Sequence, residues 1–162
     1  MQSRIEEILN LDKNETEKIH IAAHLHDIGK IGVPDAVLQK QGKLTENEWQ
    51  QMKKHPEYGA NILKKSHRLS ELSEIVLMHH ERFDGKGYPF GKSGAEIPLG
   101  ARIIAICDSI DAMTSNRCYR KSLSFETCYN EIKINLGKMY DPQIGQKVLD
   151  NWPQIIGVLG QA

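Results

Sequence analysis

The sequence has little of several features that would place it in particular classes of protein. Its three cysteines, Cys107, Cys118 and Cys128, are odd in number and lack CxxC spacing, which argues against a disulfide framework and a cysteine zinc knuckle. No apolar run approaches the roughly 20 residues of a membrane span, and the polar first residues do not form a signal peptide. We therefore expect an intracellular protein, located in the cytoplasm, with no part in a membrane.

Net charge is also missing. Lysine and arginine together number 21, and so do aspartate and glutamate, which gives a formal net charge of zero. Because binding to nucleic acid or to an anionic membrane relies on an excess of basic residues, we expect neither partner. An anionic ligand would have to be met by a local group of basic side chains.

The third absence is the alternation of apolar and polar residues that is typical of strands. Apolar residues instead recur at helical spacing, and no internal repeat is present. The chain has 162 residues, of which 40% are hydrophobic and 26% charged, enough for one domain with a proper core and short for two. We predict a single all-α domain.

One stretch combines an apolar helix with ionisable side chains. His26 and Asp27 stand side by side near the end of a helix predicted from about residue 14 to residue 28, just before a glycine stop. Helical spacing alone places His20, His24 and Asp27 on one stripe and turns His26 away. His20 and His24 could therefore bind a metal in place of His26, or both could be solvated surface residues.

Three further histidines lie at the ends of predicted helices. His55 precedes a proline at the junction of two helices, and by residue type alone a capping or surface role is favoured there. His79 and His80 end a helix predicted from residue 70, where two consecutive rings can reach a shared site once the backbone turns. A polar helix terminus is the alternative interpretation of that pair, and the shared site is favoured.

A carboxylate stands on the longest predicted helix, from residue 98 to about residue 115. Asp108 shares a helix face with three alanines, and Asp111 lies one turn further on. The small neighbours predict a buried acid, and buried carboxylates are rarely left without a metal or an arginine. Together with the histidines, Asp108 indicates a site for more than one ion of a metal such as iron, manganese or zinc.

Local signals also set several boundaries. Thr45 with Glu48 predicts a capping box, and Ser124 and Asp141 are predicted to cap the next two helices. The turn residues between 82 and 98 predict a long loop, the kind that is often functional. A helix break near residue 115 would bring the basic segment that contains Arg117 back toward Asp108.

Six motifs follow one another along the chain: HDIGK (26–30), HPEYG (55–59), HHE (79–81), DGKGYP (84–89), IPLGAR (97–102) and DSIDAMTS (108–115). Together they resemble the HD-GYP family, a branch of the HD-domain phosphohydrolases, over about residues 22–142. The resemblance implies an all-α HD-domain helical bundle with two divalent metal ions, iron or manganese. It also implies hydrolysis of cyclic di-GMP to pGpG, GMP or both through a metal-bridging hydroxide.

The resemblance assigns roles position by position. Asp27 is the expected bridge between metals and, with Lys30, a catalytic residue, and contact with diguanylate cyclase (GGDEF) domains is expected through the Gly87-Tyr88-Pro89 loop. Metal ligands are implied at His26, Asp27, His55, His79, His80 and Asp108. Substrate contacts are implied at Lys30, Gly87, Tyr88, Pro89, Arg117 and Arg120.

The sequence departs from the family at its start. Family members carry a further helix with an upstream histidine and, in trinuclear members, a glutamate, whereas no histidine precedes His20 here. We expect residues 1–162 to form one HD-GYP domain, with a core at about 14–151, a truncated N-terminal helix at 1–13 and a C-terminal tail at 152–162. A third metal is not expected.

Two other functions stay open beside the enzyme. The missing ligand would suit a catalytically weak module that binds a cyclic dinucleotide or another protein. The base-reading residues cannot be picked out from the sequence, so an HD phosphohydrolase that acts on another nucleotide is also possible.

Overall fold

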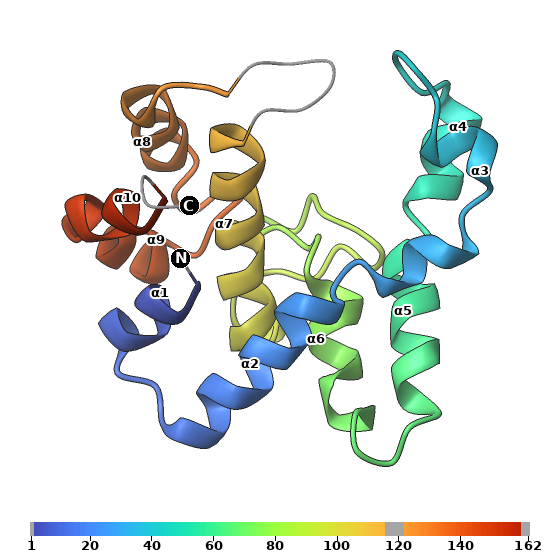
Figure 1. Cartoon of the computed structure of the whole chain (residues 1–162), viewed down its shortest axis with the longest axis horizontal. Helices are drawn as coiled ribbons and strands as arrows, with labels where there is room; N and C mark the ends of the chain where they lie inside the picture. Colours follow the sequence, from blue (N-terminus) through green and yellow to red (C-terminus); the bar gives the residue numbers. More distant parts are fainter. Residues whose placement is uncertain (1, 116–121, 160–162) are drawn as a thin grey trace.

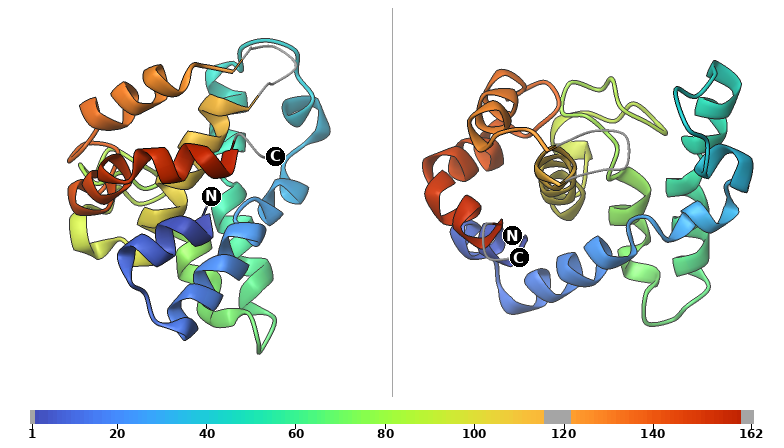
Figure 2. Two further views of the ribbon diagram at one scale, coloured as in Figure 1. Left: turned by 60° about the vertical axis from the view of Figure 1, so that its left-hand side comes forward. Right: turned by 45° about the horizontal axis from the view of Figure 1, so that its top comes forward.

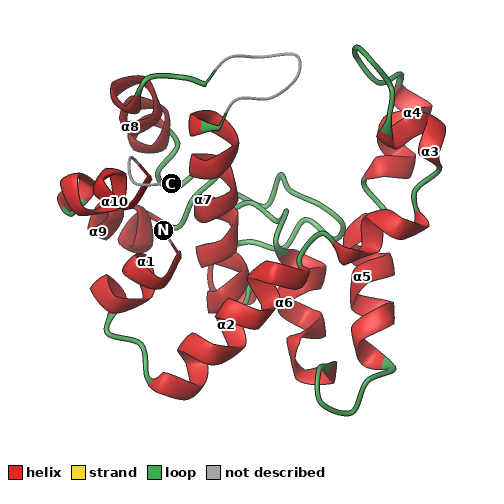
Figure 3. Cartoon of the chain, viewed as in Figure 1, coloured by secondary structure: helices red, strands yellow, loops and turns green. Residues whose placement is uncertain are grey.

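The computed structural model describes residues 2–115 and 122–159, and in this part of the chain helices are joined by loops (Figure 3). Only two isolated β-bridges occur among these residues, so the predicted all-α class is confirmed. No helix in this part is both long and apolar enough to cross a membrane. The α-helices are α1 (Gln2–Leu9), α2 (Lys13–Leu25), α3 (Asp35–Leu38), α4 (Glu46–Met52), α5 (His55–Lys64), α6 (Ser73–Met78), α7 (Leu99–Thr114), α8 (Phe125–Ile134), α9 (Pro142–Asp150) and α10 (Trp152–Leu159). The 3-10 helices are η1 (Ile28–Gly32), η2 (Ser70–Leu72) and η3 (Gly94–Glu96).

The central helix is α7, and the other helices pack on two sides of it (Figure 1). Helices α1, α8, α9 and α10 gather on one side, while α6, α5, α3 and α4 lie on the other, as both turned views also show (Figure 2). Helix α2 crosses in front and packs against α6 and α7. The main hydrophobic core runs along α7, whose Ile103, Ile106 and Ile110 are fully buried.

The predicted caps are confirmed. The Thr45 hydroxyl accepts from the Glu48 amide at the start of α4, and the Glu48 carboxylate accepts from the Thr45 amide at 2.6 Å. The Ser124 hydroxyl caps α8, and the Asp141 carboxylate caps α9. The predicted break after α7 is also present, because that helix ends at Thr114.

One helix boundary differs from the prediction. The helix expected to reach residue 28 ends at Leu25, and η1 follows, because Gly29 packs directly on the α5 backbone. The short helix α3 lies between η1 and α4. Trp152 and Ile155 of α10 are buried in the core, and Ile5 of α1 joins the same core.

Candidate metal centre

The 3-10 helix η1, which follows α2, meets the beginning of α5 at a close backbone contact. A Cβ atom on Gly29 would lie 1.9 Å from the His55 carbonyl oxygen and 2.3 Å from the Gly59 nitrogen, so no side chain fits there. This contact brings the residues before Gly29 beside the first residue of α5. It explains why the His-Asp pair needs a glycine two residues further on.

Three histidines of the site are oriented in the same way. In each, Nδ1 lies within hydrogen-bond distance of the backbone carbonyl three residues earlier, which assigns the proton to Nδ1 and leaves the Nε2 lone pair free. A backbone carbonyl on the far nitrogen is the usual support of a histidine that binds a metal. The pairs are His26 with Ala23 at 2.6 Å, His55 with Met52 at 2.8 Å, and His79 with Val76 at 2.6 Å.

Four side chains then converge on one point. Asp27, His55, His79 and His80, here called the inner cluster, each offer one ligand atom, and these atoms all lie within 4.8 Å of one another. The Nε2 atoms of His55 and His79 face each other at 3.4 Å with both Nδ1 protons directed elsewhere. Two lone pairs at this distance repel unless a cation lies between them, so the inner cluster fits a divalent metal ion.

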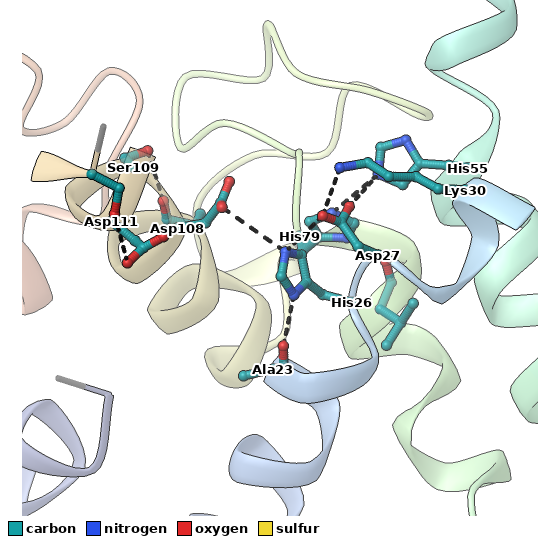
Figure 4. Close-up of polar contacts among 12 residues, drawn as sticks. Ala23, His26, Asp27, Lys30, His55, His79, Asp108, Ser109 and Asp111 are labelled. Atoms are coloured by element: carbon teal, nitrogen blue, oxygen red, sulfur yellow. Dashed lines mark hydrogen bonds and ion pairs between the residues drawn. The ribbon is translucent and has the colours of Figure 1, made fainter. Parts of the chain in front are cut away.

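A second pair of side chains extends the site toward α7. His26 and Asp108, here called the outer pair, lie with Nε2 of the histidine 3.9 Å from Oδ1 of the aspartate (Figure 4). The same Nε2 is 3.4 Å from Oδ2 of Asp27. Asp27 therefore faces both groups, since its Oδ1 is 3.4 Å from Nε2 of His55.

The protonation states suit a metal. Burial lowers the pKa of His79 well below its usual value, and it lowers the pKa of His80 to about 3 with help from the neighbouring His55. Burial also lowers the pKa of His55. Burial alone would raise the pKa of Asp27, but the Lys30 ammonium and the nearby imidazoles outweigh it and keep this pKa below its usual value. Near pH 7 the inner cluster therefore offers neutral imidazoles and an ionised carboxylate.

A loop packs over the inner cluster and is held by the residues that directly follow α6. The Tyr88 amide donates to the His80 carbonyl at 3.2 Å, and the Tyr88 ring stacks on the His80 ring at 4.9 Å. A Cβ atom on Gly87 would lie 2.5 Å from Cα of Glu81, so glycine is required at this approach. The buried Glu81 carboxylate accepts from the Phe90 amide at 2.7 Å and holds the far end of the loop.

Several residue-level predictions need correction. His55 is 2% exposed, so the surface or capping role favoured by residue type alone is wrong. Asp108 is not buried as expected, because 36% of its side chain is exposed. His20 and His24 are exposed and contact each other, and neither belongs to the inner cluster.

Of the three expected basic contacts to phosphate, only Lys30 lies within the described residues. Lys30 lies beside Asp27, with its ammonium 2.6 Å from Oδ2. Arg117 and Arg120 fall outside the described residues. Sequence reasoning missed Glu81 as the anchor of the loop, although its place directly after two histidines was a usable signal.

Comparison with known proteins agrees with this geometry. A family model described as "HD domain" matches residues 2–144. The chain is 37% identical over 157 residues to 3'3'-cGAMP-specific phosphodiesterase 2 of Vibrio cholerae, covering 96% of this chain and 30% of the relative. It is 40% identical over 159 residues to the cyclic di-GMP phosphodiesterase response regulator RpfG of Xanthomonas campestris pv. campestris, covering 97% of this chain and 42% of the relative. The chain thus spans less than half the length of these two proteins.

A solved structure has the same fold. The "HDG"Y"P protein" from Bdellovibrio bacteriovorus aligns with a TM-score of 0.70 and 21% sequence identity. The alignment covers 92% of this chain and 48% of that protein. The helices described above therefore form a known arrangement.

Proposed function

This chain belongs to the HD-GYP branch of the HD-domain family, and we propose that it is a metal-dependent phosphodiesterase domain that hydrolyses cyclic di-GMP to pGpG, GMP or both. The observation that carries this proposal is the inner cluster, whose four ligand atoms lie within 4.8 Å of one another. A phosphodiester carries negative charge and needs an electrophilic centre, and a metal held by imidazole and carboxylate supplies one.

We propose two divalent metal ions, iron or manganese. Asp27 is suited to bridge them, because one of its oxygens faces His55 and the other faces His26. The structure describes no second cluster of this kind in residues 2–115 and 122–159, and we propose no third metal. The proposed ligands are His26, Asp27, His55, His79, His80 and Asp108.

The residues of the chain have distinct roles in the proposed reaction. When bound, the ions would supply an activated water and neutralise charge on the phosphoryl oxygens. Asp27 holds the Lys30 ammonium at the site, where 44% of that side chain is exposed and can meet a phosphate. Tyr88 forms the wall beside His80, and its burial raises the pKa of its phenol, so the hydroxyl stays neutral. The oxygen of a water would bond to phosphorus as the P–O bond to the ribose breaks, and a proton from that water would end on the ribose oxygen, which leaves as a hydroxyl.

The test combines metal content with turnover. Protein purified without oxygen should contain close to two metal ions and should convert cyclic di-GMP to a linear product, whereas Asp27→Ala should lose both properties. Stoichiometric binding of cyclic di-GMP without turnover, after loading with iron or manganese, would contradict the enzyme and support a binding module. Arg117 and Arg120 remain predicted phosphate contacts. GGDEF partners and the cytoplasmic location remain predictions as well.

A second candidate substrate is 3'3'-cGAMP. The specific reason is that a relative named for this substrate is 37% identical over 96% of the chain. The two substrates share the ring of phosphates and differ in one base, so the inner cluster alone cannot distinguish them. Parallel kcat/KM measurements with both dinucleotides decide between them, and a ratio above 10 would assign the substrate.

A further inference from the structure

An aromatic and basic surface borders the candidate metal centre on the side of α4. The Trp49 ring meets the Tyr88 ring edge to face, with 6.3 Å between their centroids. The Lys53 ammonium lies 5.7 Å from the Trp49 ring centroid and 5.9 Å from the Tyr88 ring centroid. We call these three residues the α4 wall.

The α4 wall is continuous with the metal centre. Tyr88 stacks on His80 at 4.9 Å, and His80 belongs to the inner cluster. The rings therefore run from a proposed metal ligand to a surface where 39% of Trp49 is exposed. A molecule whose phosphate lies at the inner cluster would have this surface directly beside it.

The chemistry of the α4 wall suits a nucleotide. Trp49 is a large exposed ring, and every purine has a flat face that stacks on such a ring. Among the ion pairs of the described residues, none involves Lys53, so its ammonium is not neutralised by a carboxylate. By contrast, Lys40 is paired with Glu48 of α4. An ammonium held over two rings is available to a phosphate oxygen or to a guanine O6 or N7.

We propose that Trp49 and Lys53 form a base-binding subsite, in which the indole stacks on a purine of the cyclic dinucleotide and the ammonium contacts an acceptor of the same nucleotide. The inference rests on the proposed function, since it names how that substrate is positioned. Tyr88 links the subsite to the centre, so that base and phosphate are placed together.

Tryptophan fluorescence tests the stacking directly. The chain has two tryptophans, and Trp152 is buried on α10 against Tyr129. Helix α10 lies on the opposite side of α7 from α4 (Figure 1). Stopped-flow mixing with cyclic di-GMP should quench the fluorescence of the metal-loaded protein before turnover. Trp152→Phe should retain the quench, and Trp49→Phe should abolish it. A quench that survives Trp49→Phe would overturn the stacking.

Binding and kinetics test both residues. Trp49→Ala should raise the Kd and KM for cyclic di-GMP about 5- to 100-fold, the range for loss of one base stack, and Trp49→Phe should restore most of the affinity. Lys53→Met should raise KM about 10-fold, whereas Lys54→Met, the loss of an exposed neighbouring charge, should leave KM unchanged. Unchanged KM in Trp49→Ala and Lys53→Met, with normal thermal unfolding, would overturn the subsite.

The two possible contacts of Lys53 can be separated with cyclic di-AMP, which lacks guanine O6. Equal loss of affinity for both dinucleotides in Lys53→Met indicates a contact with a phosphate or with N7, which both dinucleotides carry, and loss for cyclic di-GMP alone indicates a contact with guanine O6. The same measurements distinguish failure of the proposed function from failure of the subsite. Quenching at Trp49 without turnover would reject the enzyme and retain the subsite, whereas normal turnover with unchanged KM in both variants would retain the enzyme and reject the subsite.

Discussion

On one side of the candidate metal centre, His55 and His79 are buried, with their Nε2 atoms 3.4 Å apart; on the other, His26 and Asp108 are partly exposed and 3.9 Å apart. The inner cluster draws its residues from elements that pack tightly, with η1 against α5 at Gly29 and α5 against α6 at Gly59. The outer pair joins the end of α2 to α7, as Figure 4 shows, and its side chains are 21% and 36% exposed. The difference indicates that packing fixes the inner cluster before any ion is bound, whereas the outer pair can adjust to the ion.

Removing the residue common to both groups should have the largest effect. Asp27→Ala takes away the carboxylate that faces His55 and His26, so the metal content should fall by at least half. Turnover should fall by more than the roughly 100-fold typical for loss of an outer-shell partner of a metal ligand. Elemental analysis and product chromatography measure both. Asp35→Ala, an exposed carboxylate on α3, should change neither, and a metal content equal to the parent's in Asp27→Ala would refute the bridge.

Disruption of the packing that supports the inner cluster should have the next largest effect, a loss of folding stability. Gly29→Ala puts a methyl group into the His55 and Gly59 backbone, which cannot move as a side chain can, and we expect unfolding to become easier by about 3 kcal/mol or more. Gly157→Ala is the matched control, because nothing lies within 4 Å of its Cβ position in α10. It should leave stability unchanged or raise it by about 0.5–1 kcal/mol. Urea unfolding of both variants makes the comparison.

Removal of one ligand from the inner cluster should weaken metal binding more than removal of one from the outer pair. His79→Ala should weaken metal binding about 100-fold, because a buried and oriented imidazole is lost. Asp108→Ala should weaken it only about 10-fold, because 36% of this side chain is exposed and water can replace it. Competition with a coloured chelator gives both affinities. Equal losses would show that the two groups are fixed to the same degree.

Acid should destabilise the metal-free protein through the inner cluster. The pKa values of His55, His79 and His80 are lowered in the folded state, to about 3 for His80, mainly because of burial. As pH falls below about 6.5, the unfolded chain takes up protons that the folded protein cannot, so stability is lost by at most about 1.4 kcal/mol per pH unit for each histidine. Urea midpoints between pH 7 and pH 5 measure this slope. His80→Gln should make it shallower, and an unchanged slope would refute its assignment to the cluster.

The smallest effect is expected at the start of α4, a helix that carries none of the proposed ligands. Thr45→Ala removes the hydroxyl that caps α4 and should cost about 1 kcal/mol of stability, with metal content unchanged. Ser124→Ala removes the same kind of cap from α8 and is the matched variant. Thermal unfolding and elemental analysis separate the two properties. Loss of metal in Thr45→Ala would show that α4 supports the inner cluster.

The parts predicted from sequence are those with local causes. The capping residues Thr45, Ser124 and Asp141 act on amides two or three residues away, so their helices were placed well. The helix end at Leu25 could not be placed, because it depends on contact between Gly29 and α5, a residue pair distant in sequence. Helix α3 has only four residues, too few for a periodic pattern.

The candidate site shows the same division. The position of His55 at a helix start was visible in the sequence, but its burial depends on α6 and η1 packing around it, and residue type alone favoured the surface. The small alanines on the helix face of Asp108 predicted a buried acid, yet Asp108 is partly exposed. The ordered motifs, taken as a resemblance, grouped His55, His79 and His80, which the structure brings together, where helical spacing favoured His20 and His24.

The loop that packs over the inner cluster contains two amides whose hydrogen exchange can be measured. The Tyr88 amide is bonded to the His80 carbonyl, and the Phe90 amide to the buried Glu81 carboxylate, so both exchange their hydrogens with solvent only when the loop separates from the segment that carries His80 and Glu81. Deuterium uptake at these two amides should therefore be slow for a loop, and metal loading should slow it further. Two hydrogens in the loop would then report how often the loop leaves the segment that carries the metal ligands.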